Sequence, residues 1–195
     1  MPLSFFDGDT DKILVVFFVV SKIFPIFAAS NLKVSGRYRI KMRQRRYKYQ
    51  EQIDELTELG CQLPELYHPN NMSACRFAFD DTNRQNHIPQ YMATPKRLLQ
   101  DVTKGKATTS LLALSCFTTP EKAEMFFFNL QKAFRNISNA IGNSLSEGIL
   151  SNDDGMKTET AGNGHFDFYE YEGCDLNCTF RITKKLMNNE TDKGI

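Results

Sequence analysis

The sequence predicts an α+β fold: a two-layer sandwich with a mainly antiparallel sheet, one long amphipathic helix and a C-terminal β-meander, preceded by an N-terminal apolar segment. Three observations support this prediction. An apolar run over 110–117 suits an interior strand, a capping box at Thr118 and Glu121 begins a helical stripe, and period-two segments follow. Strands, a helix and then more strands are typical of α+β domains.

The N-terminal third contains an apolar segment over 13–30, interrupted by Lys22 and Pro25. A membrane helix needs about 20 mostly apolar residues, and the acids before the segment and bases after it would place the rest of the chain in the cytoplasm. The small residues at 28–30 also suit the end of a secretory signal, although the leader is acidic. The valine-rich composition suits a buried strand as well. All three interpretations stay open, with a membrane anchor placed first.

A basic strip over 33–48 follows, with eight basic and no acidic side chains, whereas from Gln50 onward 20 acidic side chains outnumber 14 basic ones. Anionic lipid attracts such a juxtamembrane strip by about 1 kcal/mol per charge. Its tyrosines would also suit nucleic acid, but no nucleic-acid-binding motif accompanies them. A solvated strip, or one resting on the acidic body, is a further alternative. We expect contact with an anionic membrane surface through Arg37, Arg39, Lys41, Arg43, Arg45, Arg46 and Lys48.

The body begins with a helix over 50–59 and a half-buried alternating strand over 75–79. A polar loop over 80–90 leads to a short helix over 94–102, in which threonine and proline give the start signal. The strand over 110–117 then precedes the long helix.

The long helix has apolar residues three and four positions apart from Ala123 to Leu145. Continued to Gly148, it would be about 42 Å long, which exceeds a body diameter of about 40 Å. We therefore expect a break or an end at 139–143, because the asparagine and glycine there are poor helix formers.

The C-terminal part predicts a meander of neighbouring strands. Asn163-Gly164 is a two-residue hairpin signal between strands over 156–160 and 165–171. A second reversal at 172–173 leads to a third strand over 176–183, whose residues alternate between apolar and polar.

One face of the strand over 165–171 offers candidate chemistry. If Phe166 and Phe168 face the core, the opposite face combines a base, an acid and a phenol, and a cation lies on the expected neighbouring strand. Such a set can support acid–base catalysis, although an ordinary solvated sheet face would carry the same residues. The candidate catalytic residues are His165, Asp167, Tyr169 and Arg181. Glu170 lies two positions after Phe168, so the alternation places it on the same face as the phenylalanines. It lies either at the sheet edge or buried with a raised pKa, as a site candidate.

Known motifs are missing: the sequence has no Walker, dinucleotide-binding, nucleophile-elbow or kinase signature. Five cysteines without a disulfide framework favour a reducing compartment, and the three histidines are scattered, so we expect neither metal nor cofactor. We expect three parts: residues 1–49, an α+β domain over 50–187 and a tail over 188–195. The hypothesis is a membrane-tethered cytoplasmic interaction or regulatory domain, with a protein as a further partner. The alternatives are a small enzyme using the 165–171/176–183 sheet face, nucleic-acid binding by the basic strip, and a soluble cytoplasmic location.

Overall fold

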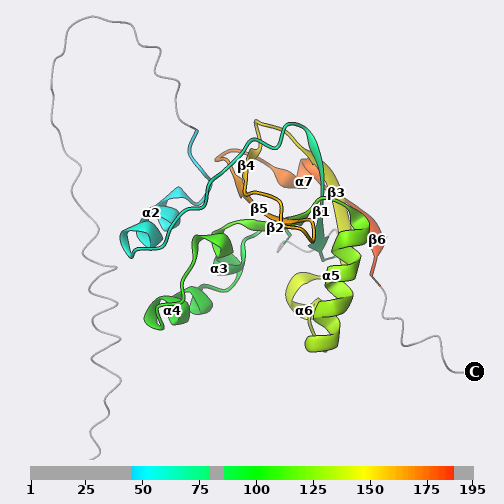
Figure 1. Cartoon of the computed structure of the whole chain (residues 1–195), viewed down its shortest axis with the longest axis horizontal. Helices are drawn as coiled ribbons and strands as arrows, with labels where there is room; N and C mark the ends of the chain where they lie inside the picture. Colours follow the sequence, from blue (N-terminus) through cyan, green and yellow to red (C-terminus); the bar gives the residue numbers. More distant parts are fainter. Residues whose placement is uncertain (1–44, 80–85, 187–195) are drawn as a thin grey trace, which may run out of the picture. The chain divides into compact units, whose positions relative to one another are not determined.

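The computed structural model describes residues 45–79 and 86–186 (Figure 1). The predicted apolar segment over 13–30, the basic strip before Arg45 and the tail over 188–195 lie outside these residues. The described chain has an α+β fold with an open six-stranded sheet, in which the strand order is β4-β5-β2-β1-β3-β6 and every pairing is antiparallel. The predicted fold class and the mainly antiparallel sheet are therefore confirmed.

The described chain contains six strands and seven helical segments, including one 3-10 helix. The strands are β1 (Met72–Ala78), β2 (Leu114–Phe117), β3 (Ser144–Leu150), β4 (Gly155–Lys157), β5 (His165–Glu170) and β6 (Arg181–Lys185). The helices are α2 (Gln50–Glu58), α3 (Gln90–Ala93), α4 (Pro95–Thr103), the 3-10 helix η1 (Thr109–Leu112), α5 (Pro120–Ala133), α6 (Ser138–Ile141) and α7 (Leu176–Thr179).

Both faces of the sheet centre are covered. On the face that we call the α7 face, Phe168 of β5 packs with Leu176 and with Phe180, the residue after α7. On the opposite face, the α5 face, Phe117 of β2 packs with Phe127 of α5. Burial of each such side chain contributes about 2–3 kcal/mol, so the two clusters hold the helices to the sheet.

A third cluster lies on the α5 face near the end of β5. There Tyr169 packs with Ile53 and Leu56 of α2, with Tyr91 of α3 and with Leu112 of η1. In Figure 1 these helices lie together with α4, on one side of α5. The cluster fixes α2, and with it the residues that precede α2, to the sheet.

The helices over 50–59 and 94–102 are confirmed as α2 and α4, and Pro95 occupies the first position of α4. The long helix differs from its prediction in cap and length. Its N-cap is Thr119, not Thr118, because the Thr119 hydroxyl accepts from the Lys122 N–H.

The long helix ends at Ala133, before the predicted break, because Phe134 adopts an extended conformation (φ −135°, ψ 96°). Ile137 and Ile141 still pack on the cluster that contains Phe117 and Phe127. Ile141 belongs to the separate helix α6, and Ile137 is the N-cap residue of that helix. Leu145, the last residue of the apolar stripe, belongs to β3, a strand that the sequence did not predict. The stripe was misleading because three separate elements bury apolar side chains in one core.

The predicted meander is wrong beyond its first hairpin. β4 and β5 pair as a hairpin, with Gly164 at φ 83°. The predicted two-residue turn is wrong, because β4 ends at Lys157 and residues 158–164 connect the two strands. Residues 176–183 do not form one strand, since α7 occupies 176–179, where the Asp175 carboxylate caps the helix by accepting from the Asn177 N–H. β6 then pairs with β3 at the far edge of the sheet, so β2, β1 and β3 separate it from β5.

The predicted strand over 110–117 is shorter than expected, because η1 occupies its first residues and β2 begins at Leu114. The strand over 75–79 is longer and more buried than expected. As β1 it begins at Met72, lies between β2 and β3, and buries Arg76 together with Cys75 and Ala74.

Candidate functional site

The proposed acid–base residues on β5 meet a serine on the adjacent strand. His165 and Asp167 both lie on the α5 face, where Nε2 of His165 is 3.8 Å from Oδ1 of Asp167. Ser115 of β2, which pairs with Asp167, places its hydroxyl 2.7 Å from the same Nε2. The ring of Phe126 on α5 stacks near the His165 ring, with centroids 6.3 Å apart.

This arrangement allows proton transfer from Ser115 to His165. Burial raises the pKa of Asp167, although His165 and a hydrogen bond with Ser110 oppose the rise. The carboxylate and the hydroxyl approach the same ring nitrogen, so Asp167 does not hold the far side of the ring as in a Ser-His-Asp triad. Sequence reasoning missed Ser115, because only the strand order places it beside His165.

The other two candidate catalytic residues are not part of this group. Tyr169 is 2 % exposed and is buried among the residues of α2, α3 and η1. Its hydroxyl makes no hydrogen bond within the described residues. Arg181 was expected on the strand next to β5, but it lies on β6 and donates to the backbone oxygens of Asn177 and Phe180. The sheet order thus separates the predicted cation from the predicted base and acid.

The described end of the basic strip is ion-paired with the body. Arg45 lies 2.7 Å from Asp153, and Arg46 lies 2.9 Å from Glu51. Lys48 lies 2.7 Å from Oε1 of Glu170. Of the predicted anion contacts, Arg37, Arg39, Lys41 and Arg43 lie outside the described residues.

Residues 45–49, which we call the connector, join the sheet next to β5. The Lys48 N–H donates to the Glu170 carbonyl, and the Glu172 N–H donates to the Arg46 carbonyl, both at 2.9 Å. Between these bonds the Tyr47 ring stacks on the Tyr171 ring, with centroids 5.5 Å apart. The connector is therefore attached by backbone, aromatic and ionic contacts together.

Glu170 is buried, which is one of the two placements that the sequence left open. It lies on the α7 face, 3 % exposed, and Oε2 has no hydrogen-bond partner among the described residues. Burial raises the pKa of Glu170, while the hydrogen bond and charge of Lys48 oppose the rise. Burial lowers the pKa of Lys48, but its bond to Glu170 outweighs this and the pKa is raised.

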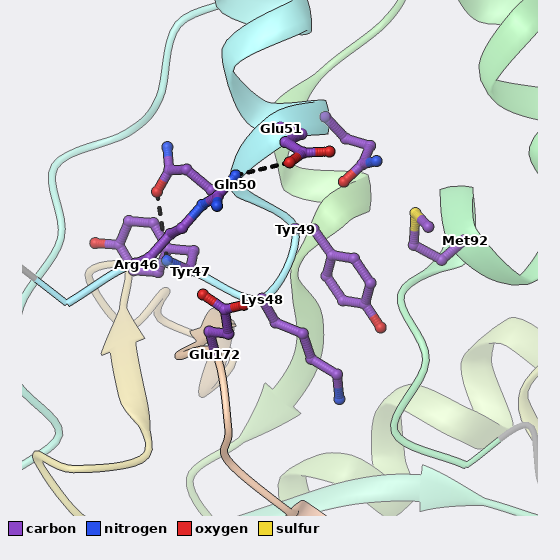
Figure 2. Close-up of a pocket in the computed structure, with 9 residues that line it drawn as sticks. Arg46, Tyr47, Lys48, Tyr49, Gln50, Glu51, Met92 and Glu172 are labelled. Atoms are coloured by element: carbon purple, nitrogen blue, oxygen red, sulfur yellow. Dashed lines mark hydrogen bonds and ion pairs between the residues drawn. The ribbon is translucent and has the colours of Figure 1, made fainter.

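A pocket of about 240 Å³ opens between the connector, the first turn of α2 and Met92 (Figure 2). Figure 2 shows the Lys48 side chain running beside the Tyr49 ring, with the ammonium 5.8 Å from the ring centroid. Three of the charged residues that line the pocket, Arg46, Glu51 and Lys48, are already ion-paired.

A second polar pair lies buried on the α7 face. Arg76 of β1 is 9 % exposed, and its Nη1 lies 2.8 Å from Nδ1 of His87. Burial, followed by the charges of Arg76 and Lys48, lowers the pKa of His87 to about 3. Sequence reasoning missed this pair, because a basic residue in an alternating strand suggests a solvent face, whereas β1 is covered on both faces.

The part of the chain that the structure describes contains no group of three His, Cys, Asp or Glu side chains able to hold a metal ion. Within it, none of the helices combines the length and apolar character needed to cross a bilayer. Comparison with protein-family models, curated proteins and solved structures finds no match.

Proposed function

We propose that the chain is a membrane-tethered interaction domain, on the cytoplasmic side, in which the connector, the last part of the basic strip, is attached to the α+β body. The attachment of the connector supports this proposal best. Two backbone bonds, a tyrosine stack and three ion pairs hold residues 45–48 to β5 and its surroundings. The described end of the strip is therefore fixed to the sheet, as a domain tethered through the preceding residues would require.

The ion pairs also narrow the residues proposed for lipid contact. Arg45, Arg46 and Lys48 already have carboxylate partners, and moving any of them to lipid would break a pair. Lipid contact is assigned to the four preceding cations, Arg37, Arg39, Lys41 and Arg43. Nucleic-acid binding by the strip meets the same restriction and lacks a motif.

Vesicle partitioning of the full chain tests the lipid contact. Wild-type protein is expected to prefer vesicles that contain phosphatidylserine over pure phosphatidylcholine, and the preference should fall as salt rises. The variant R37Q/R39Q/K41Q/R43Q should lose this preference by on the order of a thousandfold, since each charge contributes about 1 kcal/mol. Co-sedimentation measures both.

Four exposed lysines of the body provide a control with the same change in charge. The variant K96Q/K104Q/K106Q/K132Q alters side chains that are exposed on or beside α4 and α5, and it should keep the vesicle preference. Equal partitioning of wild type into both vesicles would reject lipid contact. Release of the cellular protein by salt alone would reject an anchor at 13–30.

A second candidate is an acid–base site, favoured by the 2.7 Å contact of the Ser115 hydroxyl with Nε2 of His165. Here His165 would accept the serine proton while the oxygen attacks an electrophilic acyl or phosphoryl centre. Asp167, 3.8 Å from Nε2, would stabilise the charged ring. Ser115 is exposed, so a reagent can reach it.

A fluorophosphonate reagent tests this candidate. The Ser115 oxygen would bond to phosphorus, fluoride would leave, and His165 would take the proton. Labelling should be absent in S115A and about 100-fold slower in H165Q, the usual effect of losing a general base. S73A, which alters an exposed serine of β1, should label like wild type. Unlabelled wild type, or labelled S115A, would remove the candidate.

A further inference from the structure

Arg76 is a permanent positive charge in the interior of the domain. It lies on β1 between β2 and β3, and 9 % of its surface is exposed. Arginine cannot be neutralised by losing a proton in proteins, so the fold must accommodate the cation as it is. A buried cation of this kind is normally paired with an anion.

Arg76 has no such anion within 4.0 Å in the described chain. Its side-chain partner there is His87, through Nη1 and Nδ1 at 2.8 Å. The carboxylate whose charge reaches Arg76 is Glu170, which is itself ion-paired with Lys48 at 2.7 Å. Glu170 therefore acts on two cations, Lys48 and Arg76, but it is ion-paired only with Lys48.

One edge of the Arg76 guanidinium carries an N–H group, that of Nε, without a hydrogen-bond partner among the described residues. Nη1 is engaged by His87, while Nε is buried and makes no hydrogen bond within the described residues. Nε and Nη2 form the planar fork that binds two oxygens of a carboxylate or phosphate. The orientation of this edge is fixed by the bond on the other side.

His87 orients the guanidinium. Because arginine can only donate, Nδ1 of His87 accepts the bond, and the neutral ring carries its proton on Nε2. His87 also has a left-handed backbone (φ 58°), which is uncommon outside glycine and concentrates at functional sites. Its ring packs against Phe180, with centroids 5.3 Å apart, so the group that orients Arg76 is itself held by packing.

We propose that Arg76, oriented by His87, forms a binding site for a small oxyanion, whose carboxylate or phosphate oxygens lie on the Nε–Nη2 edge of Arg76 within the α7 face. The site lies on the opposite face of the sheet from Ser115, and it does not depend on the function proposed above. It makes the body a receptor for a small anion.

The test uses the full chain with sodium phosphate and, separately, sodium acetate, against sodium chloride at the same ionic strength. Phosphate or acetate is expected to shift the Arg76 Nε–H resonance saturably in ¹⁵N NMR and to raise the thermal midpoint, because a ligand that binds only the native state stabilises it. A response to phosphate alone assigns a phosphate group, and a response to both assigns the shared oxyanion chemistry.

Two substitutions of Arg76 distinguish the contribution of its planar pair of N–H donors from the contribution of its positive charge. R76Q should weaken binding at least tenfold, and R76K, which keeps the charge without the fork, should also weaken it about tenfold. R181Q alters an exposed arginine of β6 and should bind like wild type.

Three results would overturn the proposal. The first is a wild-type Nε–H resonance that responds no more to phosphate or acetate than to chloride. This measurement decides the question even if the Arg76 variants do not fold. The second is an undiminished response in R76Q. The third is an Arg76 resonance that changes in D80N/D81N but not with added anions, which would make the chain's own aspartates, next after Phe79 in the sequence, the counter-charge.

Discussion

At the scale of single residues, two buried ionisable groups on the α7 face respond to pH in opposite directions. His87 is held neutral by burial and by the neighbouring cations, which lower its pKa to about 3. Glu170 is driven toward its neutral form by burial, which raises its pKa despite Lys48. In both cases burial favours the uncharged form of the side chain. The charged form of His87 is disfavoured as the pH falls, and the charged form of Glu170 is disfavoured as the pH rises.

The lowered pKa of His87 predicts a loss of stability in acid. Between pH 6.5, the ordinary value, and about 3, the unfolded chain binds a proton that the folded chain does not. The free energy of unfolding should therefore fall as the pH falls through this window, by up to about 2 kcal/mol between pH 6.5 and 5. His87→Asn, which tolerates a left-handed backbone and can still accept from Arg76, should remove this slope in urea unfolding.

The raised pKa of Glu170 provides the comparison of opposite sign. Between its folded pKa and 4.5, the folded chain binds the extra proton, so this group adds stability as the pH falls. E170Q should therefore make the acid slope steeper while H87N makes it shallower. Parallel pH profiles for wild type and H87N would contradict the role given to His87.

At the scale of elements, the turn from α6 into β3 approaches β1 more closely than a side chain allows. Gly142 ends α6 at φ 88°, and a Cβ there would lie 2.0 Å from the Ala78 carbonyl oxygen. This contact aligns β3 with β1, whose register pairs Ala78 with Ser144.

Three glycine-to-alanine substitutions separate backbone strain from steric overlap. Gly162 has neither a positive φ nor a neighbour within 4 Å, and Gly60 has φ 90° without a neighbour. Thermal unfolding should show little change for G162A, a cost of about 1–2 kcal/mol for G60A, and more than about 3 kcal/mol for G142A. Equal costs for G60A and G142A would show that β1 yields to the added methyl group.

At the scale of the whole molecule, the connector completes the sheet from outside the regular strands. Lys48 lies 2.7 Å from the buried carboxylate of Glu170, and its backbone bonds to the same residue. The stability of the body therefore depends on residues that precede its first helix.

Two N-terminal truncations measure this dependence. A chain beginning at Arg45 should unfold like the full protein in urea. A chain beginning at Gln50 should be less stable by about 3 kcal/mol, because it leaves the buried Glu170 without its cation. Adding E170Q to the shorter chain should recover part of the loss. Equal stability of the two truncated chains would show that the connector contacts are superficial.

Local signals account for the elements that the sequence predicted well. Proline after threonine marked the start of α4, and Asn163-Gly164 marked the β4–β5 hairpin, because each depends on backbone preferences within a few residues. β3 and the position of β6 were not predicted. Both depend on pairing between distant segments, which no local pattern encodes.

The site divides in the same way. The position of Glu170 in an alternating strand left two placements open, the sheet edge or the interior, and the placement of His165 with Asp167 on one face followed from the same period of two. The partners of these residues did not follow. Ser115 reaches His165, and Lys48 reaches Glu170, only through segments that the fold brings together.

The sequence by itself determined the α+β class, the helices next to clear caps and the separation of a basic strip from an acidic body, because these follow from composition and short-range periodicity. The tertiary structure alone decided which charges meet. Strand order placed Arg181 far from His165 and buried Arg76 beside His87. Hydrogen bonding between strands is nearly independent of side-chain identity, so the order is set by the packing of the whole core.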